Sequence, residues 1–377
     1  MEVLLIKLVL AGLVLFAVLN LAGAHTWVER KQSALIQDRI GANRASIFGF
    51  RLLGILHGLA DPIKMFTKED IVPAGANKTL HALAPFISVF FALVAFAAIP
   101  FGDRLVLGDR VIELQVANID AALLYVFAML SLGVYGVILA GFAARNNYAI
   151  MGALRATAQL ISYEIALGAA ILGVIMVYGT MDLGQMVKLQ GARPDSWMPH
   201  WGIFVQPVAF VIFLTAALAE TKRAPFDLPE GESEIIGYFV EYSGMKFGMF
   251  LFTDFLETIM VACLATTLFF GGWQVPFLVT YNPDTLDFLA TPYFRFPWGE
   301  VPVVSNWLYV FLGMASFVTK VVIFCWVFMQ LRWTLPRFRY DQLMTLGWKG
   351  LFPIAVINVV VTAVVLIFFG EPSWPQK

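Results

Sequence analysis

The sequence predicts an all-α polytopic membrane protein with about eight transmembrane helices and an amphipathic surface helix after the first span. Of its 377 residues, 60% are hydrophobic and only 14% are charged, and the mean hydropathy is +0.79. A soluble domain usually has about 45–50% apolar and about 25% charged residues. The composition therefore excludes a disordered chain, a nucleic-acid-binding protein and an ordinary cytosolic globular protein.

Eight apolar segments can each form a membrane span, because a spanning helix needs about 20 mainly apolar residues. They cover residues 3–24, 80–101, 119–144, 156–178, 203–219, 245–270, 307–330 and 351–369. The fifth segment is short and the sixth contains acids. The first is too long and apolar for a signal peptide, so we expect it to remain as a span. No internal repeat is visible, and residues 1–377 are expected to form a single integral membrane domain.

The positive charges predict which loops share one side of the membrane. The 25 lysine and arginine residues nearly balance the 26 acids, so the net charge of −1 indicates no partner. Seventeen of those 25 lie in the odd-numbered loops and five in the even-numbered loops. The positive-inside rule places the odd loops in the cytoplasm, or in a mitochondrial matrix, and both termini on the other side.

The first odd loop has the pattern of an amphipathic helix over residues 47–66. Its apolar residues, from Phe48 to Phe66, recur at helical spacing, while Asp61 and Lys64 fall on another face. Pro62 is expected to bend or restart the helix. The helix either lies in the lipid headgroup layer or roofs a hydrophobic passage that opens sideways to lipid. The run 29–31 (Glu-Arg-Lys) lies at the mouth of such a passage, or is only a positive-inside signal.

Several ionisable residues fall inside the predicted spans, where each costs about 2.5–3.5 kcal/mol on the insertion scale. These are Glu164, Asp254, Glu257 and Lys320, and Glu220 closes the fifth span. Asp254 and Glu257 share one helix face because they are three residues apart. Buried acids exchange protons near neutral pH, which suits a proton relay. The alternative is a set of fixed polar contacts between helices, with Lys320 neutralised by one acid.

The densest feature is an acidic loop over residues 219–241. Its acids are Glu220, Asp227, Glu230, Glu232, Glu234 and Glu241, and its bases are Lys222 and Arg223. Pro225 and Pro229 favour a defined turn over a helix. The loop contains no histidine, so we expect no catalytic metal. It is either a solvated acidic surface or a proton reservoir coupled to a site at the membrane surface.

These motifs make the chain resemble the H-subunit family of proton-pumping NADH:quinone oxidoreductase, respiratory complex I. The similar stretches are TWVERK (26–31), QDRIGANR (37–44), LADPIKMFTKED (59–70), YAIMGALRATAQLISYEIALG (148–168), AETKRAPFDLPEGESE (219–234) and LPRFRYDQLMTLGWKGLFP (335–353). They follow the order of the family almost from end to end. The chain departs from the usual family pattern at Ala42, Asp254 and Glu257.

The resemblance implies a role for each group of residues. Glu29, Arg30, Arg39, Asp61, Lys64 and Glu69 match the quinone entrance and chamber rim of the family. Glu230, Glu232 and Glu234 match its acidic coupling loop, and Glu164, Glu220 and Glu241 match its proton path.

The resemblance also implies a substrate and partners. The substrate would be a quinone, either ubiquinone or menaquinone. The partners would be the peripheral-arm quinone-site and terminal iron–sulfur subunits, small membrane subunits, antiporter-like subunits and lipid. This chain is expected to bind no flavin or iron–sulfur cluster itself. Its cysteines, Cys263 and Cys325, lie in apolar runs without cluster-ligand spacing.

Three other functions remain open from the sequence. The chain could be the equivalent subunit of a membrane-bound hydrogenase-type complex, a stand-alone proton or cation transporter, or a passive scaffold. The subunit could move a proton itself or only relay the coupling. A bacterial inner membrane is favoured over a mitochondrial one, because several loops are longer than is typical of the mitochondrial form.

Overall fold

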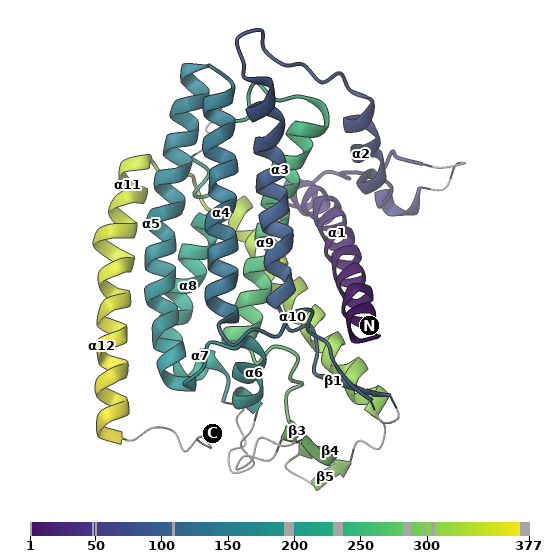
Figure 1. The fold of residues 1–377 in the computed structure, drawn as a ribbon, viewed down its shortest axis with the longest axis vertical. Helices are drawn as coiled ribbons and strands as arrows, with labels where there is room; N and C mark the ends of the chain where they lie inside the picture. The colour runs from purple at the N-terminus through teal and green to yellow at the C-terminus, as the bar shows by residue number, and fades with distance from the viewer. Residues whose placement is uncertain are drawn as a thin grey trace.

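The computed structural model describes residues 2–46, 49, 51–107, 110–191, 200–228, 237–281, 288–296, 299–302 and 306–369. Within this part of the chain, seven helices are long and apolar enough to cross a membrane, which confirms the predicted all-α polytopic fold (Figure 1). These are Leu4–Ile36, Lys78–Ala98, Ala122–Ala143, Asn147–Tyr178, Gly244–Phe269, Trp307–Thr334 and Tyr340–Phe368.

The helices follow one another along the chain as α1 (Glu2–Ile36), α2 (His57–Thr67), α3 (Lys78–Ala95), α4 (Ala122–Ala143), α5 (Asn147–Tyr178), α6 (Leu183–Gly191), α7 (Gly202–Val205), α8 (Pro207–Glu220), α9 (Gly244–Phe269), α10 (Asn306–Thr334), α11 (Tyr340–Thr345) and α12 (Phe352–Phe369). A π-helical turn, Leu346–Leu351, joins α11 to α12. Short 3-10 turns lie at Leu52–Gly54 and Phe96–Ala98.

The fifth predicted span, 203–219, is observed as two shorter helices. Gln206 is non-helical (φ −132°, ψ 61°) and separates α7 from α8, which begins at Pro207. Proline suits a first helical position because its missing N–H group would have no partner there. The 14 residues of α8 are fewer than a helix needs to cross the hydrocarbon core alone.

The surface helix is shorter than predicted. Helix α2 begins at His57 rather than at residue 47, and residues 47, 48 and 50 lie outside the described part. Leu52, Leu53 and Gly54 have positive φ angles of 41°, 55° and 86°, so the backbone cannot continue as one helix through them. Pro62 lies inside α2 without ending it, which excludes the restart but not the bend that was also expected.

The first helix is longer than its predicted span. A single helix, α1, runs from Glu2 to Ile36, so the triplet 29–31 lies within it rather than after it. In Figure 1, α2 lies beside the end of α1 that is farther from the N-terminus. The two helices are therefore positioned so that the charged end of α1 can meet α2.

Close helix packing places α4 against α3 and α5. A Cβ atom at Gly136 of α4 would lie 2.2 Å from the Ser88 Oγ of α3, and one at Gly141 would lie 2.4 Å from the Ala153 Cβ of α5. Small residues let membrane helices approach closely enough for van der Waals contact between backbones. These glycines bring α4 close to α3 and to α5, the helix that carries Glu164.

Helix α9 lies at the centre of the bundle, and α1 and α12 lie at its periphery. In an apolar 18-residue window of each span, 72% of the residues are buried in α9, against 6% in α1 and 17% in the span Tyr340–Phe368, which contains α12. Large apolar side chains of α12 such as Ile367 and Phe368 are 78% and 79% exposed. Such surfaces suit lipid or partner helices, whereas acids on α9 must be accommodated inside the protein.

Two small antiparallel sheets lie outside the spans and were not predicted from the sequence. Strands β1 (Arg104–Leu107) and β2 (Arg110–Glu113) form a hairpin. Strands β3 (Leu278–Tyr281), β4 (Phe288–Phe296) and β5 (Gly299–Pro302) form the second sheet in that order.

The helices and strands of the odd-numbered and even-numbered predicted loops lie at opposite ends of the bundle. In Figure 1, β1, the second sheet and α6 lie at the lower end, whereas α2 and α11 lie toward the upper end. The first group comes from even-numbered predicted loops and the second from odd-numbered ones. This arrangement agrees with the sidedness expected from the positive charges.

Candidate functional site

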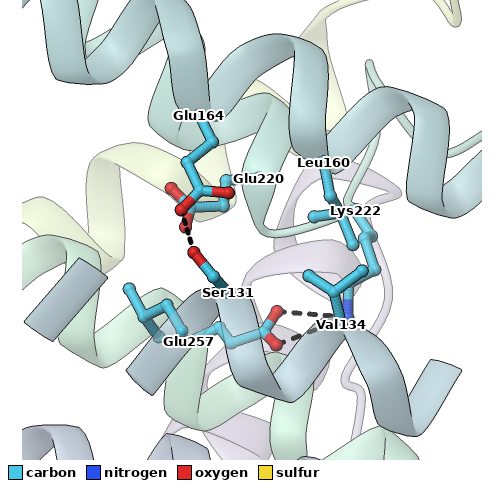
Figure 2. A pocket seen from close by; sticks show the side chains of 8 residues that line it. Ser131, Val134, Leu160, Glu164, Glu220, Lys222 and Glu257 are labelled. Atoms are coloured by element: carbon cyan, nitrogen blue, oxygen red, sulfur yellow. Dashed lines mark hydrogen bonds and ion pairs between the residues drawn. The ribbon is translucent and has the colours of Figure 1, made fainter. Parts of the chain in front are cut away.

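A small cavity inside the bundle brings together acids from three different helices. Glu164 of α5, Glu220 of α8 and Glu257 of α9 line it together with Lys222 (Figure 2). The remaining lining residues are Leu130, Ser131, Val134 and Leu160. The cavity has room for about one water molecule. A site of this size can pass protons but cannot hold a quinone ring.

Glu164 is held by a hydroxyl group on the neighbouring helix. Ser131 Oγ of α4 donates a hydrogen bond to Glu164 Oε1, and the same Oγ lies 2.9 Å from the backbone oxygen of Phe127 (Figure 2). A hydroxyl has one proton, so it donates to only one of these acceptors at a time. The Ser131 hydroxyl can therefore donate either to the Glu164 carboxylate or to the backbone oxygen of Phe127.

Lys222 is the cation that balances two acids of α9. Its Nζ lies 3.3 Å from Asp254 Oδ1 and 3.2 Å from Glu257 Oε2. The three side chains are only 3%, 7% and 15% exposed, respectively. Asp254 and Glu257 share a face of α9, as their spacing predicted, and this face is turned toward Lys222. A buried charge of this kind requires such partners, because desolvation is costly.

The backbone at Lys222 is also unusual. Helix α8 ends at Glu220 with Thr221 as its C-cap, and Lys222 follows in the left-handed conformation with φ 55°. Glycine is usual at this position, and another L-residue pays roughly 1–2 kcal/mol for it. Lys222 therefore occupies this position against the backbone preference. The sequence pattern assigned Lys222 only to the acidic loop, and its role in the cavity was missed.

A second charged cluster joins residues far apart in the sequence at the charged end of α1. Glu29 is buried, and its Oε2 lies 3.3 Å from Arg223 NH1, while Arg332 NH1 of α10 binds its Oε1. The Arg223 guanidinium lies 4.1 Å from the centre of the Phe255 ring. His25, one turn before Glu29, packs edge-on against the same ring. The cluster combines cations, an acid and an aromatic surface.

Residues 8–363 of the chain match the NADH dehydrogenase family. The chain belongs to this family. It is 42% identical to an H-type subunit of NADH-quinone oxidoreductase from Cytophaga hutchinsonii over 98% of each chain. It is 42% identical to the H-type subunit of NADH-quinone oxidoreductase from Thermomicrobium roseum (96% of this chain, 97% of the relative) and 40% identical to NADH-quinone oxidoreductase subunit 8 of Rhodothermus marinus (96% and 97%). The predicted resemblance is confirmed.

The residues that resemble the quinone entrance of the NADH dehydrogenase family are only partly brought together. Arg30 NH2 lies 2.5 Å from Asp61 Oδ2, which ties α1 to α2. Arg39, Lys64 and Glu69 are exposed. Arg39 Nε donates to Gln37 Oε1 at 2.7 Å, two residues away. The entrance prediction therefore rests on Glu29, Arg30 and Asp61 rather than on all six residues.

Glu241, the third acid of the predicted proton path, lies in a different environment from Glu164 and Glu220. It is not among the residues that line the cavity, and Asn146 Nδ2 donates to its Oε1 at 2.7 Å. His81 Nε2 lies 3.3 Å from its backbone oxygen, and the His81 ring stacks on Tyr242 at 3.9 Å. Glu241 therefore has its own polar cluster between α3 and the start of α5.

The acidic loop typical of the family is described only at its two ends. Glu230, Glu232 and Glu234 lie outside the described residues. Before them, Gln159 Nε2 of α5 donates to the backbone oxygens of Ala219 and Phe226 at 2.7 and 2.8 Å. These bonds fix the start of the loop to the helix that carries Glu164.

Asp227 anchors the same loop from the other side. Its Oδ2 accepts a hydrogen bond of 2.8 Å from Arg337 NH2, in the segment between α10 and α11. Burial raises the pKa of Asp227 to about 6 and outweighs the opposing effect of Arg337. The loop is thus attached both to α5 and to the 335–339 segment.

Lys320, the cation predicted inside the seventh span, binds backbone oxygens. Its Nζ donates to Phe270, Gly272 and Gln274 at 2.8, 2.9 and 2.6 Å and lies 4.6 Å from the Trp201 ring centre. Phe270 is the C-cap of α9, whose last carbonyls need external donors. The suggested neutralisation of Lys320 by an acid is thus replaced by capping of a helix end.

Proposed function

We propose that this chain is the membrane subunit of a proton-pumping NADH:quinone oxidoreductase. In this proposal it forms the membrane side of the quinone chamber and couples quinone reduction to proton translocation. The single observation that carries the coupling role is the cavity that collects Glu164, Glu220, Glu257 and Lys222 inside an apolar bundle. The named relatives and the NADH dehydrogenase family supply the identity of the complex.

The cavity has the chemistry needed for proton transfer. A single water or the Ser131 hydroxyl can bridge neighbouring carboxyl oxygens and pass a proton between them. Glu164 and Glu220 reach the cavity from different helices, so a small movement of either helix changes their separation. The site can therefore respond to a change of charge nearby by taking up or releasing a proton.

The quinone would approach through the charged end of α1. A quinone has a long apolar tail and a polar head, so its site needs an apolar passage that ends in a few polar groups. Helix α2 offers exposed apolar side chains such as Leu59, Ile63 and Phe66 next to the Arg30–Asp61 ion pair. The Glu29, Arg223 and Phe255 cluster supplies the polar end.

Charge links the two sites. Reduction of a quinone to a quinol takes up two electrons and two protons, so the charge near the chamber changes by up to two units until the protons arrive. Lys222 and Arg223 are adjacent in the chain: Lys222 belongs to the cavity and Arg223 to the Glu29 cluster. A charge change at Glu29 and Arg223 therefore alters the electrostatic potential at the adjacent Lys222 and at the acids that line the cavity with it.

Partners and location follow from the same role. Quinone-site and iron–sulfur subunits of the peripheral arm would face the acidic loop and α2, and small membrane and antiporter-like subunits and lipid would cover the apolar helices. Flavin and iron–sulfur clusters would be held by those other subunits. The bacterial relatives favour a bacterial inner membrane.

The experiment compares Glu164→Gln with wild type in inverted membrane vesicles that contain the assembled complex. We expect quinone reduction by NADH and proton uptake into the vesicles to fall together by about tenfold or more. Peripheral-arm activity with an artificial electron acceptor reports that assembly is intact. If the variant pumps at the wild-type rate, the acid is structural and the coupling proposal is wrong.

A further inference from the structure

We infer that Lys222 is a positioning residue that sets how many protons the acids of the cavity hold, through its ion pairs with Asp254 and Glu257. This inference rests on the proposed function and adds a residue to it. The three charged groups are called the Lys222 triad below. With all three ionised, the triad has a net charge of −1.

The geometry gives Lys222 a role beyond ending α8. Glycine would end the helix without backbone strain, because it adopts the left-handed conformation readily. A lysine that only balanced one acid would leave the second acid unpaired, whereas Nζ lies 3.2–3.4 Å from oxygens of both Asp254 and Glu257. The chain thus accepts strain in order to place one cation between two carboxylates.

The triad is part of the cavity rather than beside it. Lys222 and Glu257 line the cavity together with Glu164 and Glu220, and Figure 2 shows the Glu257 carboxylate directed at the Lys222 ammonium group. Across so small a cavity, and in a medium of low dielectric constant, one unit of charge strongly favours or opposes the ionisation of a neighbouring carboxyl group. The charge of the triad therefore acts on the two acids of the proposed proton path.

Ionisable groups surround Lys222 from several elements. Asp254 and Glu257 of α9 form ion pairs with it, and Glu220 at the end of α8 and Glu164 of α5 line the same cavity. Tyr238, from the segment before α9, also contributes to its electrostatic environment, and Arg223 contributes to that of Glu257. The cavity lining from α4 includes Ser131 and Val134, which carry no charge.

The test varies the net charge of the triad in both directions. Lys222→Asn changes it from −1 to −2, and asparagine tolerates the left-handed backbone. Glu257→Gln changes it from −1 to 0 with the same side-chain size. The double variant Lys222→Asn/Glu257→Gln returns it to −1 without the Lys222–Glu257 pair.

The measured quantity is the pH dependence of NADH:quinone reduction and of proton uptake in vesicles with the assembled complex. We expect the profile to move by about one pH unit, toward alkaline pH in Lys222→Asn and toward acidic pH in Glu257→Gln. The profile of the double variant should lie close to that of wild type, displaced by no more than about a third of the shift seen in the single variants. A merely structural pair would lower the amount of complex without moving the profile in opposite directions.

Two results would overturn the inference. One is a wild-type profile in both single variants. The other concerns the case in which Lys222→Asn does not accumulate: the inference is overturned if the double variant does not accumulate either. Recovery of the complex in the double variant supports it. Glu164→Gln keeps the two proposals apart. If it abolishes pumping while the Lys222 and Glu257 variants keep the wild-type pH profile, this inference is wrong and the proposed function still holds.

Discussion

Replacement of Glu29 by glutamine should destabilise the protein strongly, because one carboxylate satisfies two arginines. The Glu29 side chain is 9% exposed, and those of Arg223 and Arg332 are 10% and 28% exposed. Removal of one partner from a buried ion pair costs about 3–5 kcal/mol, since it leaves an uncompensated charge. Arg332 reaches water, so we reduce the expected loss to about 2–4 kcal/mol.

The chain provides a matched control in an exposed ion pair. Arg339 NH2 lies 2.9 Å from Asp341 Oδ2, and the two side chains are 77% and 74% exposed. Exposed pairs contribute about 0–1 kcal/mol, so Asp341→Asn should cost less than about 1 kcal/mol. Both substitutions exchange a carboxylate for an amide of the same shape, and they differ in burial and in the number of arginines that the carboxylate contacts.

The assay follows the unfolding of the chain in the purified, detergent-solubilised complex. Increasing concentrations of a denaturing detergent are added, and the folded fraction is read from resistance to limited proteolysis. A difference of about 1.4 kcal/mol corresponds to a factor of about ten in the unfolding equilibrium. The two expected losses differ by at least about 1 kcal/mol, so Glu29→Gln should raise the ratio of unfolded to folded chain at least about fivefold more than Asp341→Asn. Equal effects of the two variants would refute the assignment of Glu29 as a buried link between α1, the α8–α9 segment and α10.

Three other variants test separate parts of the structure. Glu232→Gln should lower quinone reduction and proton pumping together in the assembled complex, and two wild-type rates would contradict a coupling role for the acidic loop. Gly136→Leu should destabilise the contact of α4 with α3 by more than the usual range of about 1–3 kcal/mol for overpacking, because its Cβ would lie 2.2 Å from Ser88 Oγ, and unchanged accumulation of the chain would argue against that contact. Asp227 binds protons more readily in the folded state (pKa about 6) than in the unfolded chain (3.8), so its contribution to stability should fall as the pH rises from about 4 to 6; Asp227→Asn should remove this pH dependence in unfolding measurements, and an unchanged slope would contradict it.

The membrane-spanning segments were predictable because they depend on local properties of the sequence. A run of apolar residues prefers lipid whatever its neighbours are, and seven such runs are helices of spanning length in the described part of the chain. The ends of the helices were less predictable. The start of α2 depends on positive φ angles at Leu52, Leu53 and Gly54, and the division between α7 and α8 lies at Gln206.

The candidate site was predictable as a list of acids but not as an arrangement. The high cost of a charge in lipid marked Glu164, Glu220, Asp254 and Glu257 without any knowledge of the fold. Their grouping depends on how the helices are rotated and packed, which the hydrophobic pattern does not encode. Glu164 and Glu220 therefore share a cavity, whereas Glu241 binds Asn146 elsewhere.

The sequence by itself determined that this protein is a helical membrane protein of the NADH dehydrogenase family, with acids where an apolar bundle should exclude them. Only the tertiary structure decided which charge balances which. Lys222 is 32 residues from Asp254 and Glu29 is 303 residues from Arg332, yet each pair is in contact. The physical reason is that exclusion of a charge from lipid is a property of one residue, whereas neutralisation of a buried charge requires two side chains brought together by packing.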